Sequence, residues 1–212
     1  MRQLVILLVW FYALISYAQT ISLAPDFTIE PCQPTVKSIS LEGEFSKAVE
    51  DRIAVLFDAD QLERNESFTD GEIPDSELLM TMLNNDLARR LEVYGYLVNG
   101  QVASGQAFYH AAFIFQHGDC PEHYGLANTL AEKAIDLGYE DARWIYAASL
   151  DRYLLSAGKK QKFGTQFQTE DGCTYKLKPF NPDTTDEERK AYNVPPPLER
   201  ALEFPQTGSS CQ

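Results

Sequence analysis

The sequence from Phe108 to Phe167 decides the fold: FYHAAFIFQHGDCPEHYGLANTLAEKAIDLGYEDARWIYAASLDRYLLSAGKKQKFGTQF. Apolar side chains recur in it at steps of three and four residues, which is the period of an amphipathic helix. Gly118, Gly138 and Gly158 follow these apolar runs, and a glycine just past the last helical turn is a typical helix stop. The stretch therefore predicts three helices, at about 105–117, 119–137 and 141–157.

The last two of these helices are expected to form a closely packed hairpin. Their link is short, and small alanines on both helices would let the two axes approach closely. These alanines are Ala127, Ala131, Ala134, Ala142, Ala147 and Ala148. The pair resembles one unit of a tetratricopeptide or Sel1-type repeat, but no second copy follows at a fixed period, and a solenoid needs several.

Two more helices are expected before this stretch. Apolar spacing predicts the first over 45–62, with its packing stripe at Phe45, Val49, Ile53, Leu56 and Phe57. The second is expected from Asp75 to Val98 and is ended by an Asn-Gly pair. Its core-facing side is expected to carry Leu79, Met82, Leu83, Leu87, Leu91 and Tyr94.

The chain changes character after Gly158. Strand-like segments at 163–168 and 173–177 flank a polar loop with a glycine, which predicts a short hairpin lying on the helices. Capping-box spacing from Thr185 predicts a short helix to about Tyr192. The expected fold class is mainly α: a single helical domain with about five core helices, a short β-hairpin flap and a short C-terminal helix. Its expected parts are an extended arm over 19–43, the helical domain over 44–204 and a tail over 205–212.

The first 18 residues have the features of an export signal. Arg2 gives a basic start, an apolar run extends from Leu4 to Tyr17, and Ser-Tyr-Ala at its end fits the small-x-small rule for signal peptidase. An uncleaved anchor is the alternative, but the run is shorter than the roughly 20 residues that span a bilayer. We therefore expect cleavage after Ala18 and a secreted protein.

All four cysteines, Cys32, Cys120, Cys173 and Cys211, lie in the exported part of the chain, where disulfides form. Four cysteines allow three pairings, and the sequence does not choose among them. We favour Cys32 with Cys211, which would tie the two tails, and Cys120 with Cys173, which would pin the flap to the helices. No CxxC motif is present, so a zinc ribbon is not expected. Asn65 begins the one Asn-x-Ser/Thr sequon and is the expected glycosylation site.

The chain is strongly acidic. Its formal charge of −13 becomes −14 when Arg2 leaves with the signal, and 12 of its 31 acidic residues lie between Glu42 and Glu77. Such a surface repels nucleic acid and anionic lipid, so neither a nucleic-acid partner nor a membrane is expected after cleavage. A cationic partner is one interpretation of the charge, and a solvated secreted surface is the simpler one.

Asp151 and His117 carry the clearest chemical signal. Asp151 shares a helix face with Trp144 and other apolar residues, and a buried carboxylate needs a hydrogen-bond or charge partner. Arg152 points elsewhere on the same helix, so we expect the partner to be His117 or a group of the 161–166 turn. A structural pair that fixes the flap is the plainer interpretation, and acid–base chemistry by His117 with Asp151 is the alternative.

The histidine spacing does not favour a metal site. His110 and His117 are seven residues apart, about 10 Å along a helix, which is too far for one metal ion. His123 begins the next helix and could approach His117, but no nearby acidic ligand pattern accompanies the three histidines. We therefore expect no metal and no other cofactor.

The turn after Gly158 offers neutral hydrogen-bonding groups, from Gln161, Gly164, Thr165 and Gln166. These groups suit a polar ligand or a developing oxyanion, and they equally suit a network bonded to its own backbone.

These residues also carry a resemblance. Gln116-His117, Asp151-Arg152 and the segment GKKQKFGTQ over 158–166 resemble an uncharacterised bacterial and fungal family with the pattern Q-H, D-R and G-K-x-Q-x-(Tyr/Phe)-G-T-Q. The resemblance covers 108–167, with a looser echo over 185–198. It implies a shared site but no reaction.

Three functions follow as hypotheses. The first is a secreted module that binds a small polar ligand or peptide, and the second is a metal-independent hydrolase or isomerase in which Asp151 orients His117. Both require the polar residues to converge in one pocket, whereas the third, a purely structural role, requires them to be sealed and mutually saturated. The expected ligand-binding residues are His110, Gln116, Trp144, Arg152, Gln161, Gly164, Thr165 and Gln166.

Overall fold

The structure, a computed structural model, describes residues 32, 34, 39–67, 75–169 and 175–194. These residues belong to one compact unit that begins at Cys32. The expected signal segment, most of the expected arm, the C-terminal tail, Cys173 and Cys211 lie outside the described residues.

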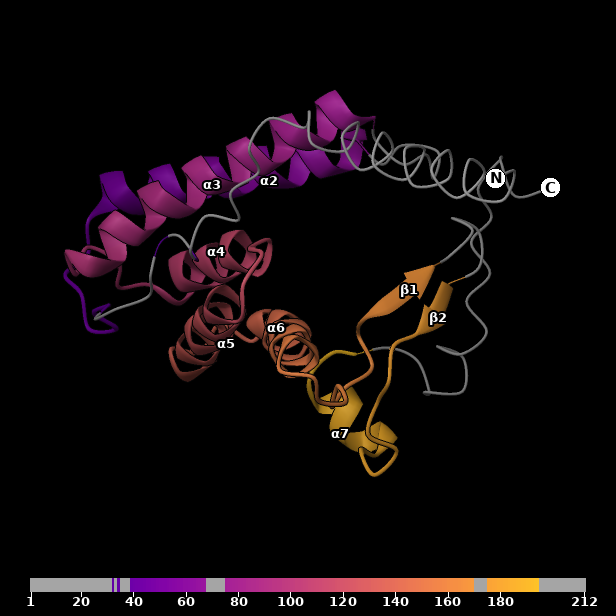
Figure 1. The fold of residues 1–212 in the computed structure, drawn as a ribbon. Coiled ribbons are helices and arrows are strands. Elements are labelled where there is room, and N and C mark those ends of the chain that lie inside the picture. Colours follow the sequence, from indigo (N-terminus) through magenta and orange to yellow (C-terminus); the bar gives the residue numbers. More distant parts are fainter. Residues whose placement is uncertain (1–31, 33, 35–38, 68–74, 170–174, 195–212) are drawn as a thin grey trace, which may run out of the picture. The chain divides into compact units, whose positions relative to one another are not determined.

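The described residues form six helices and one small hairpin, so the expected mainly α fold is confirmed (Figure 1). The helices are α2 (Lys47–Ser67), α3 (Ser76–Val98), α4 (Gly105–Gln116), α5 (Pro121–Asp136), α6 (Ala142–Ser156) and α7 (Asp186–Ala191). The strands are β1 (Phe167–Thr169) and β2 (Tyr175–Leu177), which pair antiparallel with Gln168 opposite Lys176.

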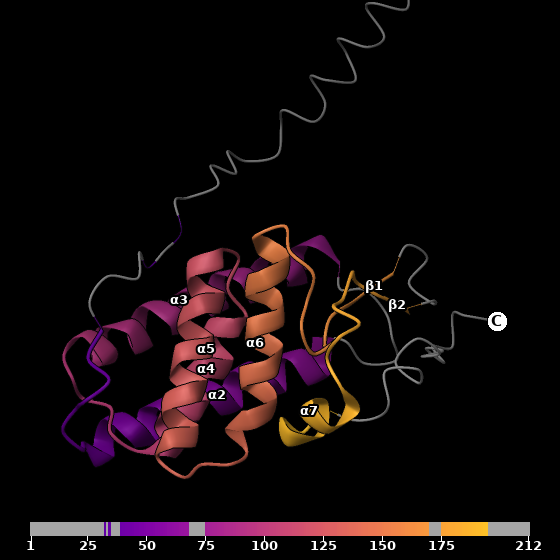
Figure 2. The same cartoon turned by 90° about the horizontal axis from the view of Figure 1, so that it is seen from below.

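The two long helices α2 and α3 lie side by side, and α4, α5 and α6 pack in sequence order from them (Figures 1 and 2). Ion pairs fix α2 and α3 as antiparallel, because Arg52 near the start of α2 bonds to Glu92 near the end of α3, while Arg64 near the end of α2 bonds to Asp86. The α5–α6 pair is the predicted close hairpin.

Short polar residues begin several helices as their sequences predict. The side chains of Asp75, Ser104 and Thr185 accept hydrogen bonds from backbone N–H groups in the first turns of α3, α4 and α7. α5 begins at Pro121, two residues after the expected start at 119, and its N-cap Cys120 forms no side-chain capping hydrogen bond.

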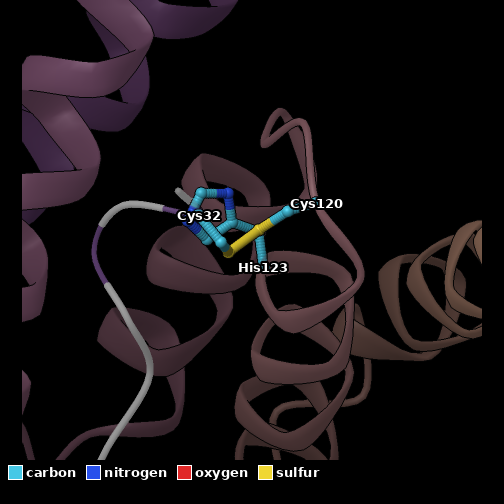
Figure 3. Close-up of side chains that lie close together, drawn as sticks. All are labelled: Cys32, Cys120 and His123. Carbon is cyan, nitrogen blue, oxygen red and sulfur yellow. A yellow bond between two sulfur atoms is a disulfide. The ribbon is translucent and has the colours of Figure 1, made fainter. Parts of the chain in front are cut away.

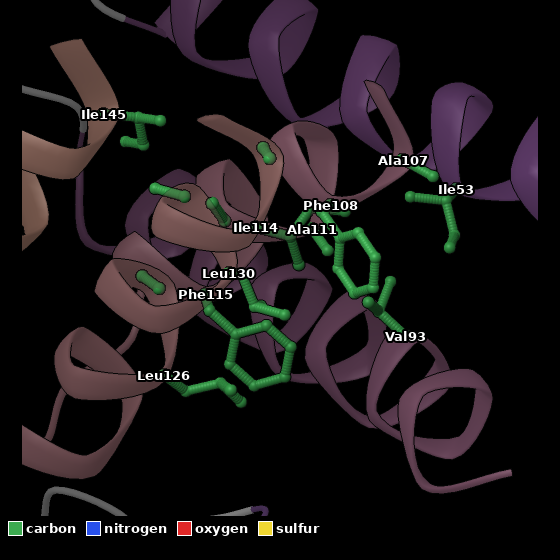
Figure 4. Packing of buried hydrophobic residues seen from close by; sticks show 14 of the residues in the cluster. Ile53, Val93, Ala107, Phe108, Ala111, Ile114, Phe115, Leu126, Leu130 and Ile145 are labelled. Carbon is green, nitrogen blue, oxygen red and sulfur yellow. The ribbon is translucent and has the colours of Figure 1, made fainter. Parts of the chain in front are cut away.

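The main core lies where α4 meets the other helices (Figure 4). Phe108 and Phe115 of α4 are fully buried, as are Ile53 of α2, Val93 of α3 and Leu130 of α5. The alanines predicted to bring α5 and α6 together are also fully buried, which confirms that prediction: Ala127, Ala131, Ala134, Ala142, Ala147 and Ala148.

The inward face of α3 was predicted only in part: Met82 is buried and Tyr94 packs against the core, as expected, but three of the expected leucines are exposed. Leu79, Leu83 and Leu91 are 42%, 40% and 47% exposed. The buried residues of α3 are Met82, Asp86, Arg89, Arg90, Val93 and Leu97. Asp86 and Arg89 form ion pairs with α2, and these pairs set the rotation of α3 about its axis. A prediction based on apolar residues alone does not include these charged positions.

Two other expected core residues are on the surface. Phe45 precedes α2 and is 66% exposed, and Trp144 of α6 is 38% exposed beside Phe113. Among the described residues, no helix is both long and apolar enough to cross a membrane.

Candidate functional site

The carboxylate of Asp151 is enclosed by the turn that follows α6. One oxygen accepts from the N–H groups of Lys162 and Phe163, at 2.7 and 2.8 Å. The other accepts from the N–H and the hydroxyl of Thr165, at 2.9 and 2.8 Å. Asp151 is fully buried, so these four donors replace water around its charge.

Gln161 closes the same turn from inside. Its amide nitrogen donates to the carbonyls of Gln166 and Lys178, and its amide oxygen accepts from the N–H of Gln166. Gly164 has a φ of 74°, a left-handed conformation that suits glycine. The turn is therefore held by saturated hydrogen bonds, and this is why β1 begins at Phe167 rather than at the expected residue 163.

This geometry identifies one of the two partners predicted for Asp151. The partner is the 161–166 turn, and the side chains of the turn bond mainly to backbone and to each other: Gln166 donates to the hydroxyl of Thr165 at 2.9 Å. The arrangement is that of a structural anchor, so Asp151, Gln161 and Thr165 have their hydrogen-bonding capacity committed to the fold.

His117 has a different carboxylate partner. Its Nδ1 lies 3.1 Å from the carboxylate of Asp60, a fully buried residue of α2. Its Nε2 lies 3.2 Å from the amide nitrogen of Gln116. Burial lowers the pKa of His117, although Asp60 opposes that shift. Burial alone would raise the pKa of Asp60, but its hydrogen bond to His117 and the charges of His117 and Arg64 lower it overall.

An ion-pair network extends from Asp60 along the α2–α3 interface. Arg64 bonds to Asp60 at 2.8 Å and to Asp86 at 2.7 Å. Arg89 bonds to Glu63 at 2.7 Å and to Asp86 at 3.0 Å. The carboxylates of Asp60 and Asp86 are therefore already engaged with these two arginines and His117.

Arg90, on the adjacent position of α3, is only partly satisfied. One guanidinium nitrogen donates to the carbonyl of His117 at 2.9 Å, but its buried Nε has no hydrogen-bond partner. Gln116 beside it is 3% exposed, and its amide oxygen is also buried without a partner. Burial is the main cause of a lowered pKa at Arg90.

Arg152 is the least satisfied cation of this region. Its Nη1 is buried with no hydrogen-bond partner, and no described carboxylate forms an ion pair with it. Burial lowers the pKa of Arg152, with a further contribution from the positive charge of Arg64. Burial raises the pKa of Tyr124, and the positive charges of Arg152 and Arg90 oppose that rise, so both cations act electrostatically on this phenol.

The expected site residues therefore divide into separate groups. His117 and Asp151 do not pair, because each is bonded to another element. Arg152 is electrostatically coupled to both groups, since the charges of Arg64 and Asp151 both affect its pKa. Gln116, His117, Arg90, Arg152 and Tyr124 make up what we call the arginine cluster.

His110 and Trp144 lie outside the arginine cluster. The ring of His110 stacks on Phe57 with centroids 4.3 Å apart, and burial lowers its pKa. His110 also lines a hollow of about 340 Å³ between α2 and α4, beside Glu50 and Ser104. Trp144 stacks on Phe113.

The favoured disulfide pairing was wrong. Cys32 is bonded to Cys120, with Cα atoms 5.8 Å apart, and this bond excludes both pairs expected from the sequence. The bond ties the start of the compact unit to the start of α5. Asn65 is exposed near the end of α2.

Sequence reasoning missed the buried charges of α2 and α3. A signal was present, because Asp86, Arg89 and Arg90 interrupt an otherwise apolar series at Met82, Val93 and Leu97 with helical spacing. A charged residue at a core position of a helix indicates a partner on a neighbouring element. Comparisons of the chain with protein-family models, curated proteins and solved structures find no match.

Proposed function

We propose that this chain is an exported helical protein that binds a small carboxylate-bearing ligand, a metabolite or the end of a peptide, at the arginine cluster. The observation that carries the proposal is the pair of buried guanidinium nitrogens without partners, on Arg90 and Arg152. An uncompensated buried charge costs several kcal/mol, on the order of 3–5 kcal/mol when a partner is removed. A ligand anion would offset that cost.

The neighbouring carboxylates do not meet this need. Asp60 and Asp86 bond to His117, Arg64 and Arg89, and Asp151 accepts four hydrogen bonds from the turn after α6. The chain has a net charge of −13, yet no carboxylate within the described part of the chain forms an ion pair with Arg152. Among the described residues, these buried donors of Arg90 and Arg152 therefore have no acceptor, and a ligand carboxylate would supply one.

The donor set favours a carboxylate. A guanidinium is a planar fork of N–H donors that matches the two oxygens of a carboxylate or phosphate. The unpartnered amide oxygen of Gln116 and the phenol of Tyr124 would add neutral contacts to the polar part of a ligand. His117 is neutral near pH 7 because its pKa is lowered, so it adds no further cation to bind a multiply charged group.

The test is thermal unfolding of the exported protein with acetate, succinate, citrate, glutamate and inorganic phosphate at constant ionic strength. We expect a carboxylate to raise the melting temperature of the wild type, since a ligand at 100 times its Kd stabilises by about 2.7 kcal/mol. Arg152→Gln should lose this effect. Lys160→Gln, which removes one exposed positive charge, should keep it.

The same variants distinguish binding from scaffolding. An unpaired buried charge destabilises the free protein, so Arg152→Gln without ligand should melt at the wild-type temperature or above it. A loss of more than about 1 kcal/mol would instead identify Arg152 as structural. Ligand stabilisation that survives in Arg152→Gln, or stabilisation by phosphate alone, would contradict the carboxylate site.

A second candidate function is metal-independent acid–base catalysis, with Asp60 in place of Asp151 as the partner of His117. Its support is the 3.1 Å contact between Nδ1 of His117 and the Asp60 carboxylate, which orients a neutral imidazole that is 14% exposed. A hydrolysis screen of p-nitrophenyl esters and amides should then show activity that falls on the order of 100-fold in His117→Gln. Equal rates in wild type and variant would reject it.

Export and glycosylation belong to the same proposal. The Cys32–Cys120 bond supports an oxidising compartment, and the exposed position of Asn65 supports modification there. N-terminal sequencing of the secreted protein should begin at Gln19. Treatment with a peptide N-glycosidase should lower the mass of the wild type and leave Asn65→Gln unchanged.

A further inference from the structure

The disulfide lies against a buried histidine, as Figure 3 shows. The sulfur atoms of Cys32 and Cys120 and a ring nitrogen of His123 all lie within 4.8 Å of one another. His123 is fully buried at the start of α5. Three groups with the ligand atoms of zinc sites are therefore gathered at one point.

We propose that Cys32, Cys120 and His123 form a binding site for a zinc-class divalent metal ion, and that this site exists only when the disulfide is reduced. In the disulfide each sulfur is bonded to the other and is a poor ligand. A dithiol reductant transfers two electrons and two protons to the bond, giving two protein thiols and its own disulfide. The metal ion then displaces both thiol protons and binds two thiolates and one imidazole.

The distances suit this chemistry. Zinc binds sulfur at about 2.3 Å and imidazole nitrogen at about 2.0 Å in a tetrahedron, so its ligand atoms lie roughly 3.5–3.8 Å apart. The three atoms here are within 4.8 Å, and once the sulfur–sulfur bond is broken they need only small side-chain movements. The Cα atoms of Cys32 and Cys120 are 5.8 Å apart, so the two sulfurs stay close to each other after the bond is broken.

The surroundings favour the thiolate form and orient the imidazole. Cys120 is the N-cap of α5, and the N-terminal end of a helix stabilises an adjacent negative charge. The carboxylate of Asp119 lies 3.4 Å from Nδ1 of His123. A carboxylate beside a histidine ligand is a common second partner in zinc sites, and it fixes the orientation of the ring.

The site would act as a redox-controlled metal carrier. In the reverse step the two thiolates pass two electrons to a small-molecule disulfide, which takes up two protons and leaves as a dithiol; the protein disulfide forms, two of the three ligands are lost and the ion is released. The inference stands apart from the carboxylate site, because it uses none of the residues of the arginine cluster.

The test uses the exported protein with Cys173→Ser and Cys211→Ser, so that the other thiols cannot bind metal. Cobalt(II) is the probe, because its thiolate charge-transfer and d–d bands report sulfur ligands and tetrahedral geometry, and zinc(II) competition gives the Kd. We expect one cobalt per chain after reduction with a phosphine. The oxidised protein should bind cobalt more than 100-fold more weakly than the reduced protein. Loss of a group that only supports a metal ligand costs at most roughly 100-fold, so a larger drop indicates loss of the ligands themselves.

Variants assign the ligands. Cys32→Ser and His123→Asn should each abolish the tetrahedral cobalt spectrum, while His110→Asn should leave it unchanged. Asp119→Asn should keep the spectrum and weaken zinc binding about 10-fold. Far-UV circular dichroism checks folding, and Cys32 precedes all of the described helices, so its substitution gives a test with the helices kept.

Three outcomes would overturn the proposal. They are a reduced protein that binds neither ion, a Cys32→Ser variant that binds like its parent, and equal affinity in the oxidised and reduced forms. A His123→Asn variant that folds and keeps the spectrum would remove the histidine from the site and reject the three-ligand assignment.

Discussion

Asp151→Asn tests how the chain after α6 is held to the helices. The substitution keeps the shape of the side chain but replaces one carboxylate oxygen with an NH₂ group. The remaining oxygen can still accept from the N–H groups of Lys162 and Phe163. The NH₂ group would face the N–H of Thr165, which the carboxylate now accepts at 2.9 Å. The backbone N–H of Thr165 would thus lose its acceptor and face the donor NH₂ group of the new asparagine instead.

The magnitude follows from these bonds. Hydrogen bonds to a charged group contribute about 1.5–3 kcal/mol each, and a buried donor left unsatisfied costs about 1–3 kcal/mol. The Thr165 hydroxyl can rotate to accept from the new NH₂ group, so one bond rather than two is lost. We expect Asp151→Asn to reduce the free energy of unfolding by about 3 kcal/mol, which lowers the melting temperature by about 6–12 °C for a domain of this size.

Urea unfolding followed by circular dichroism measures the free energy, and amide hydrogen exchange reports the turn itself. The N–H groups of Lys162, Phe163 and Thr165 should exchange slowly in the wild type and faster in the variant. Asp183→Asn makes the same chemical change at an exposed position and should alter stability by less than about 0.5 kcal/mol. An Asp151→Asn protein as stable as this control, with the three amides still protected, would refute the anchoring role.

Three further results are expected. Burial lowers the pKa of His117 below its value in the unfolded chain, so the unfolded state binds more protons as the pH falls through about 6.5. The free energy of unfolding should therefore decrease on acidification. His117→Gln should reduce the slope of this free energy against pH between about 7 and 5. A β-carbon at Gly118 would lie 2.3 Å from Nδ1 of His123, so Gly118→Ala should lower the free energy of unfolding by about 1–3 kcal/mol. A β-carbon at Gly125, inside α5, would make only ordinary contacts. Gly125→Ala should therefore raise the free energy of unfolding by about 0.5–1 kcal/mol in the same urea assay. The disulfide closes a loop with a sequence separation of 88, so Cys32→Ser should cost about 4–5 kcal/mol in oxidised protein and nothing under reduction, and an equal cost in both conditions would contradict the crosslink.

The sequence alone determined most of the helical fold. Periodic apolar residues and short polar caps are local signals, and they predicted the ends of the five core helices to within five residues. The alanines of α5 and α6 likewise predicted a close hairpin, because small side chains let two helix axes approach closely. The fully buried Asp151 was also foreseeable, since it lies on an otherwise apolar face.

The tertiary structure decided which distant residues meet. Asp60 of α2 reaches His117, and Cys32 bonds to Cys120, across 57 and 88 residues of sequence. Pairings of this kind depend on how helices rotate and cross, and no local spacing encodes that. The same holds for Arg152, because only the packing of the described helices shows that its Nη1 is buried without a hydrogen-bond partner there. Local sequence sets the elements because backbone preferences act over a few residues, whereas the site depends on side chains brought together by the packing of whole helices.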